Sequence, residues 1–128
     1  MANELILIVE DNDKNMKLAR DILQVKGYRT LEAESAEAGL PLVAAQKPDL
    51  VLMDIHLPGM SGIDALKKLR ASPDTSRIPV LAFTASVMPQ DRSEIMAAGF
   101  DAFVSKPINL RAFLDAVAAT LAPAGRTA

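Results

Sequence analysis

The sequence predicts a doubly wound α/β fold, in which a parallel sheet carries helices on both of its faces. Short apolar runs alternate with amphipathic stretches of helical length along the chain. The first run, from Leu5 to Val9, is apolar without a break, as expected of a strand that is buried on both faces. Because strands and helices alternate strictly, parallel pairing with right-handed crossovers is favoured.

Five strands are expected, and each is a short apolar run that ends in polar or turn-forming residues. The second strand is the weakest, since only part of it is apolar. The third and fourth strands are followed directly by Asp54 and Thr84. The expected strands span residues 5–9, 30–33, 50–53, 80–83 and 102–104.

Five helices fill the intervals between and after these strands. Asp13 is the expected cap of the first helix, and Gly27 ends it. The second helix contains Pro41, which we expect to fray or kink it. Pro89 suits the first turn of the fourth helix, and Asn109 caps the fifth. The second and third helices are expected at residues 35–45 and 61–70.

Length and composition indicate one domain. The chain has 128 residues, of which 50% are hydrophobic, and this is enough for one globular core but not for two. We therefore expect a single domain over residues 1–128, with a core at about 4–121 and a loose tail at 122–128.

Composition also excludes several classes of function. The chain has no cysteine and one histidine, which excludes disulfides, thiolate catalysis and metal sites built from several histidines. A net charge of −2 without a basic cluster argues against binding to nucleic acid or to an anionic membrane. No apolar run is long enough for a signal peptide or a membrane span, so a cytoplasmic location is expected.

Polar side chains gather where the predicted strands end. In a parallel sheet the carboxyl ends of the strands form one edge, and the functional crevice of such folds lies there. The residues expected at this edge are Glu10, Asp11, Asp54, Thr84, Ser105 and Lys106.

Three carboxylates at one edge repel each other unless a cation lies among them. Mg²⁺ is the natural cation, because it prefers oxygen ligands and bridges carboxylates to phosphate. Asp54 could then act as a carboxylate nucleophile toward a phosphoryl group. Lys106 and Thr84 would supply a charge and a hydroxyl donor to the phosphoryl oxygens.

Four segments, "ILIVEDND", "PDLVLMDIHLPGMSG", "IPVLAFTA" and "FVSKP", together resemble the receiver domain of two-component response regulators, the fold exemplified by CheY. The resemblance covers about residues 4–121. It implies a flavodoxin-like sheet of strand order 2-1-3-4-5 flanked by five helices. In "VEDNDKNMKL" and "SKPI" the chain is similar to DivK-type single-domain regulators.

The resemblance implies a role for each residue at the edge. Asp54 is the implied phosphoacceptor, Glu10 and Asp11 hold Mg²⁺ directly or through water, and the backbone carbonyl of His56 completes the protein's share of the metal shell. Thr84 and Lys106 take the positions of the family's hydroxyl and lysine.

Further roles also follow from the resemblance alone. Pro107 would follow a cis peptide bond that aims Lys106 at the site. Phe103 takes the place of the switch aromatic, which turns inward on phosphorylation, although it lacks the hydroxyl of the commoner tyrosine. His56 and Ser86 occupy positions that tune how quickly the acyl phosphate hydrolyses.

These roles imply a signalling function rather than an enzyme that acts on a separate substrate. The expected phosphodonor is a sensor histidine kinase or a histidine phosphotransfer protein. The expected output is binding of a target protein by the fourth helix, the fifth strand and the fifth helix, because few residues follow Leu121 and no output domain is expected after it.

Two alternatives use similar residues. A haloacid-dehalogenase-type phosphatase also has a strand-end aspartate, but its second acid would stand at His56, and the chain has no cap domain. A degenerate receiver or flavodoxin-like binding module would lack part of the acceptor set or carry a phosphate-binding glycine loop. The chain fills all five key positions and has no GxGxxG motif.

Overall fold

The computed structural model describes residues 4–84, 89–105 and 108–121, apart from two side chains near the start of the fourth helix. It contains one parallel sheet of five strands in the order β2-β1-β3-β4-β5. The strands are β1 Leu5–Val9, β2 Arg29–Ala33, β3 Leu50–Asp54, β4 Val80–Thr84 and β5 Ala102–Ser105. The helices are α1 Asp13–Val25, α2 Ala36–Gln46, α3 Gly62–Ala71, α4 Pro89–Ala98 and α5 Leu110–Leu121. The predicted fold class and strand order are confirmed.

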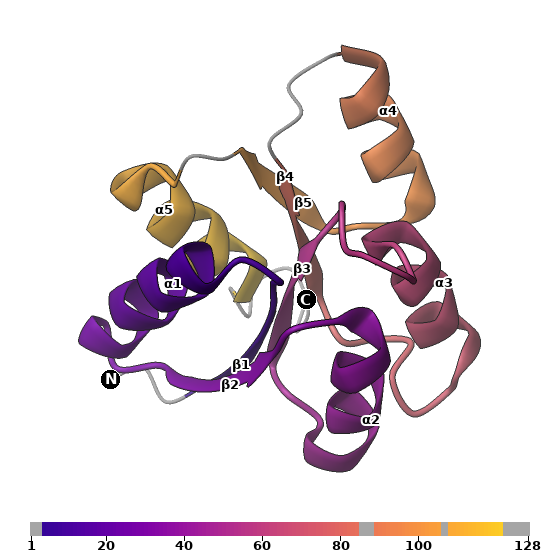
Figure 1. Ribbon diagram of the computed structural model, residues 1–128, viewed down its shortest axis with the longest axis horizontal. Helices are drawn as coiled ribbons and strands as arrows, with labels where there is room; N and C mark the ends of the chain where they lie inside the picture. The colour runs from indigo at the N-terminus through magenta and orange to yellow at the C-terminus, as the bar shows by residue number, and fades with distance from the viewer. Residues whose placement is uncertain (1–3, 85–88, 106–107, 122–128) are drawn as a thin grey trace.

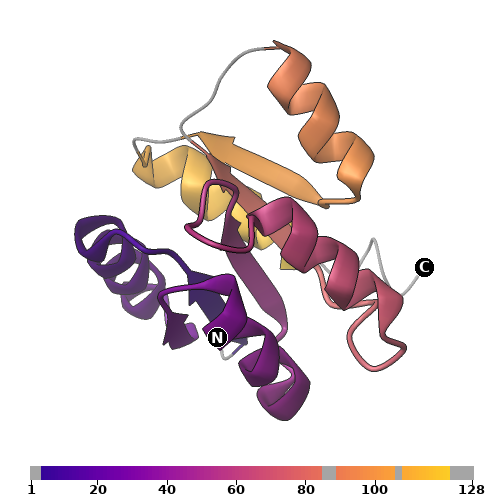
Figure 2. The same ribbon diagram turned by 45° about the vertical axis from the view of Figure 1, so that its right-hand side comes forward.

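The helices cover the two faces of the sheet in separate layers (Figure 1). α1 and α5 lie together on one face, and the turned view in Figure 2 shows α2 and α3 on the other face, with α4 beyond α3. This division follows from right-handed crossovers on either side of the point where the winding reverses, between β1 and β3.

The alternation of side chains along β3 divides the core between the two layers. Val51 and Met53 pack toward α2 and α3, whereas Leu50 and Leu52 pack toward α1 and α5. All four side chains are buried, as is typical of a central strand in a parallel sheet. The apolar run that predicted this strand therefore reflects burial on both faces.

The N-cap of the first helix lies one residue earlier than predicted. Asn12, in extended conformation, is the N-cap of α1, and its side chain accepts a hydrogen bond from the backbone N–H of Asn15. Asp13 is the first helical residue, and its negative charge interacts favourably with the positive end of the helix dipole. The prediction of Asp13 as the cap is wrong because two adjacent residues could both cap, and the backbone conformation selects Asn12.

The second helix is not interrupted by its proline. α2 runs through Pro41, so the expected fraying is not observed. The face formed by Ala36, Gly39 and Val43 is buried, whereas Pro41 lies on the exposed side, where water can solvate the carbonyl of Glu37 that lacks an amide partner. Packing of the buried face thus outweighs the weakness that the proline introduces.

Arg70 links several segments at the edge of the sheet opposite the carboxyl ends of the strands. Its guanidinium donates hydrogen bonds to the carbonyls of Ser76, Ile78 and Gly99 at 3.1, 2.7 and 3.3 Å, and to the Asp101 carboxylate at 3.1 Å. Asp101 also accepts the backbone N–H of Val80 at 2.8 Å. One side chain therefore joins α3 to the segments that lead into β4 and β5.

We expect Arg70→Ala to lower the free energy of unfolding by about 2 kcal/mol, because it leaves the partly buried carbonyls of Ser76 and Ile78 without their charged donor. Urea denaturation would measure the loss. Lys67→Ala, at an exposed position on the same helix, is the matched control and should change stability little. Equal stabilities of the two variants would contradict the role given to Arg70.

Candidate functional site

The candidate site lies at the carboxyl edge of the sheet, where β1 and β3 end side by side. Asp54 is the last residue of β3, and Glu10 and Asp11 directly follow β1. One carboxylate oxygen from each of these three residues lies within 4.8 Å of the others. Glu10 and Asp54 are only 1% and 3% exposed, whereas Asp11 faces solvent. The three acids therefore lie together at the edge of the sheet where the sequence predicts them.

Backbone amides orient the two buried carboxylates. Glu10 accepts a hydrogen bond from the N–H of Asn12 at 3.1 Å, and its own N–H donates to the carbonyl of Ala33 at 3.0 Å. The Oδ1 atom of Asp54 accepts the N–H of His56 at 3.0 Å. These bonds fix the acids from their own loops, so the mutual repulsion of the carboxylates does not drive them apart.

The donor set suits a hard divalent cation. It offers carboxylate oxygens only. Two of them belong to buried side chains and one to an exposed side chain, so an ion and its waters could enter the site from the exposed side. Mg²⁺ takes such ligands and keeps several waters. The site is thus a candidate metal centre with an open side.

The loop after β3 runs past this site. His56 is exposed, as expected of a side chain that points outward, and its neighbours Ile55 and Leu57 are buried. Ile55 donates its N–H to the carbonyl of Phe83 at 3.1 Å, and its carbonyl accepts the N–H of Gly62 at 3.0 Å. The backbone that carries the His56 carbonyl is therefore tied at both ends to regular structure.

The predicted hydroxyl and switch residues lie on the neighbouring strands. Thr84 ends β4 and is completely buried, and it pairs in register with Ser105 of β5. Phe103, two residues earlier on β5, is half-buried, and the guanidinium of Arg92 lies 5.2 Å from the centre of its ring.

Three predicted residues lie outside the part of the chain that the structure describes. They are Ser86, Lys106 and Pro107. Their roles, including the cis peptide bond, stay predictions from the sequence.

One contact near the site was not anticipated from the sequence. The carboxylate of Glu37, in the first turn of α2, accepts the backbone N–H of Met60 at 3.1 Å. The two residues are 23 positions apart, and only Met60 lies in one of the four segments that resemble the family. Gly59 next to Met60 is the one local signal, since glycine in a loop often permits close approach of another group.

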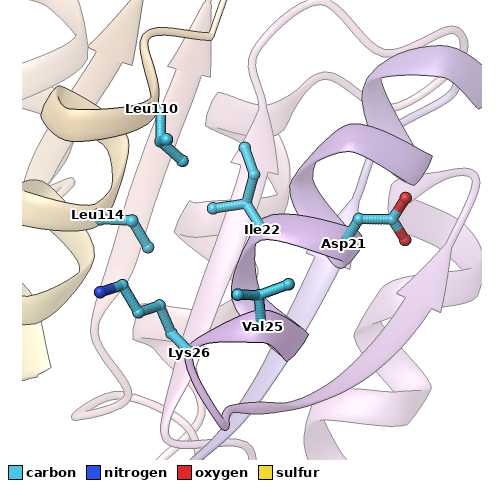
Figure 3. A pocket seen from close by; sticks show the side chains of 6 residues that line it. All are labelled: Asp21, Ile22, Val25, Lys26, Leu110 and Leu114. Atoms are coloured by element: carbon cyan, nitrogen blue, oxygen red, sulfur yellow. The ribbon is translucent and has the colours of Figure 1, made fainter.

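An apolar cavity of about 320 Å³ lies away from the acids, between α1 and α5 (Figure 3). Ile22 and Val25 of α1 face Leu110 and Leu114 of α5 across it. Asp21 points away from these side chains, and its hydrogen bond with Lys17 lowers the pKa of the Asp21 carboxyl below its ordinary value. The cavity shares no residue with the acidic cluster.

Within the described residues, no helix has both the length and the apolar character that crossing a bilayer requires.

Comparison with known proteins agrees with the geometry. The model of the response regulator receiver domain family matches residues 6–118. The polar-differentiation response regulator DivK of Brucella ovis is 40% identical over 119 residues, covering 93% of this chain and 97% of that protein. The similarity to DivK-type regulators expected from the sequence is confirmed.

Solved structures with the same fold include two that are more than a quarter identical in sequence. A CheY-like receiver domain protein of Methanospirillum hungatei has a TM-score of 0.86 at 27% identity, with 98% of this chain and 99% of that chain covered. The receiver domain of a sensor histidine kinase from Pseudomonas aeruginosa, with magnesium coordinated in its active site cleft, has a TM-score of 0.86 at 28% identity and covers 93% and 98% of the two chains. The phosphatase and flavodoxin-like alternatives are not favoured, and the chain belongs to the response regulator receiver domain family of two-component signalling.

Proposed function

We propose that this receiver accepts a phosphoryl group on Asp54 and transmits the signal by binding a protein partner in its phosphorylated form. The observation that carries the proposal is the position of Asp54, a buried carboxylate at a strand end with two further acids within 4.8 Å. A buried aspartate among acids is unfavourable for stability alone, and such arrangements are typical of functional sites. In this proposal the receiver unit spans about residues 4–121.

The proposed reaction is transfer from a phosphohistidine. One carboxylate oxygen of Asp54 attacks phosphorus in line with the leaving nitrogen, so that an O–P bond forms while the N–P bond breaks. The released imidazole takes up a proton, and the product is an acyl phosphate. The backbone N–H of His56 donates a hydrogen bond to Oδ1 of Asp54 and thereby orients the carboxylate that attacks.

The residues that would hold Mg²⁺ are Glu10, Asp11 and Asp54 through their carboxylates and His56 through its backbone carbonyl. When bound, the ion offsets the charge of the acids and stabilises charge on the phosphoryl oxygens. The magnesium ion named for the receiver of Pseudomonas aeruginosa supports this assignment.

We assign the remaining roles as the sequence suggests. The Thr84 hydroxyl and the Lys106 ammonium would each contact a phosphoryl oxygen, with Pro107 orienting the lysine. Drawing Thr84 toward the phosphoryl group would vacate space for Phe103. His56 and Ser86 would modulate hydrolysis. In this scheme the domain assists its own phosphorylation and dephosphorylation but turns over no separate substrate.

The proposed partners are proteins. A sensor histidine kinase or a histidine phosphotransfer protein would supply the phosphoryl group in the cytoplasm. A target would then recognise the surface formed by α4, β5 and α5, where Phe103 and Arg92 lie. We expect no binding to nucleic acid or membrane, because the net charge is −2 and the sequence has no basic cluster.

Acetyl phosphate with Mg²⁺, followed by intact-mass measurement, tests the proposal. We expect one phosphate to be added per chain and the addition to be lost when EDTA removes the metal. Failure of the native chain to gain mass, or labelling that EDTA does not affect, would contradict the proposed chemistry. Steady turnover of a generic phosphate ester without labelling would favour a phosphatase instead.

A further inference from the structure

We propose that Glu37 is a positioning residue that holds the loop after β3 in the shape needed to bind the metal. The inference rests on the proposed function, because it concerns the loop that carries the His56 carbonyl. Glu37 lies on α2, outside the set of acids that would touch Mg²⁺. Its contact is with the loop backbone and not with the ion.

The link is a hydrogen bond across the fold. The Oε2 atom of Glu37 accepts the N–H of Met60 at 3.1 Å. Glu37 stands in the first turn of α2, and Ser35 caps this helix by accepting the N–H of Ala38 at 3.1 Å. The carboxylate therefore projects from a fixed helix start onto a loop. A charged acceptor makes a stronger bond to a backbone amide than a neutral one does.

Gly59 allows this close approach. Its φ of 75° is in the left-handed region, where a side chain is strained. A Cβ atom added at Gly59 would also lie 2.7 Å from Oε2 of Glu37. The carboxylate thus occupies the space that a side chain at Gly59 would need, so the glycine and the glutamate depend on each other.

The hydrogen bond between Met60 and Glu37 lies next to the exposed apex of the loop. The loop is tied near its ends by the bonds of Ile55, and Leu57 is anchored by burial. Pro58 and Gly59 are exposed, so the amide of Met60 is the point at which α2 restrains the apex. Loosening the apex would let the backbone around His56 sample other orientations and would weaken a metal ligand that is a carbonyl oxygen.

The first experiment compares Glu37→Ala and Glu37→Gln with the native chain. Amide hydrogen exchange of Met60 and His56, measured by NMR without metal, reports the loop directly. Calorimetric titration with Mg²⁺ reports the affinity of the site. We expect Glu37→Ala to speed exchange at Met60 and to weaken Mg²⁺ binding, each by about fivefold, and Glu37→Gln to retain most of both because its amide oxygen can still accept the bond.

Glu34→Ala is the matched control. Glu34 is an exposed acid just after β2, three residues from Glu37, so its replacement removes the same charge near the same edge of the sheet. The control should leave exchange at Met60 unchanged. A similar loss of Mg²⁺ affinity in the Glu34 and Glu37 variants would show a general charge effect and overturn the proposal.

A double-mutant cycle with Gly59→Ala tests the mutual dependence. The new methyl group should push the Glu37 carboxylate off Met60, so that the single change already speeds exchange at Met60. Adding Glu37→Ala should then have little further effect on exchange. Strictly additive effects would contradict the shared space, as would unchanged exchange in Glu37→Ala.

These measurements separate the inference from the function on which it rests. If the native chain took up no phosphate from acetyl phosphate, the proposed function would fail, while exchange at Met60 would still decide whether Glu37 holds the loop. If phosphorylation occurred but Glu37→Ala left both exchange and Mg²⁺ affinity unchanged, only the inference would fail.

Discussion

Replacement of Asp54 by asparagine is expected to abolish phosphorylation and, without metal, to stabilise the fold. Asparagine keeps the Oδ1 acceptor for the His56 N–H but lacks the nucleophilic carboxylate. It also removes one of three negative charges whose oxygens lie within 4.8 Å. We expect the free energy of unfolding in EDTA to rise by about 1 kcal/mol, because the repulsion between partly buried carboxylates is relieved.

The variant is expected to lose phosphorylation while its free energy of unfolding in EDTA rises, and this combination makes the test specific. Intact-mass measurement after acetyl phosphate should show label on the native chain and none on Asp54→Asn. Urea denaturation with and without Mg²⁺ should show that the ion stabilises the native chain more than the variant, since binding to the folded state alone adds stability. A damaging core mutation would also abolish labelling, but it would lower stability in EDTA.

Asp74→Asn is the control for the loss of one negative charge. Asp74 is exposed in the segment between α3 and β4, so its variant should be labelled normally and show an unchanged response to Mg²⁺. Labelling of Asp54→Asn at the native level would mean that another residue accepts the phosphoryl group.

Much of this site was predictable because it follows from topology. Once the strands are parallel, the residues that follow them lie at one edge of the sheet, and this places Glu10, Asp11 and Asp54 at the same edge. Local patterns also located the strands to within one or two residues, since continuous apolar runs are typical of strands buried on both faces.

The order of the strands was not predictable from local patterns. Periodicity shows which face of an element is apolar but not which element lies beside it, so the order 2-1-3-4-5 came from the family resemblance alone. Within elements, small energy differences decided the outcome. Asn12 and Asp13 can both cap a helix, and Pro41 is tolerated because it lies on the exposed side of α2.

The hydrogen bond from Met60 to Glu37 shows why positioning contacts are harder to predict than the acids themselves. It joins residues 23 positions apart through one side-chain oxygen, and the sequence alone does not distinguish Glu37 from the exposed Glu32 and Glu34 nearby. Only the packing of α2 beside the loop selects Glu37. A sequence pattern predicts the helices and strands. It does not predict their relative positions accurately enough to identify a single hydrogen bond between them.

Gly62→Ala is expected to cause the largest loss of stability among the substitutions proposed. Gly62 begins α3, and an added Cβ would overlap the carbonyl oxygen of Asp54 and lie 3.0 Å from the Cα of Ile55. These are backbone atoms at the end of β3, so no side chain can rotate to make room. We expect the free energy of unfolding to fall by about 3 kcal/mol, because relief requires displacement of the strand end from the helix.

Gly39→Ala separates this steric effect from the general effect of replacing a buried helical glycine. At Gly39 the added Cβ would lie 3.0 Å from a methyl group of Val9, which can shift, and alanine favours the helix. Urea denaturation should therefore show a much smaller change for Gly39→Ala. Because the backbone that Gly62→Ala displaces carries Asp54, the variant should also bind Mg²⁺ more weakly under conditions where it is still folded. Native Mg²⁺ affinity in folded Gly62→Ala would show that the metal site does not depend on the close contact between α3 and the end of β3.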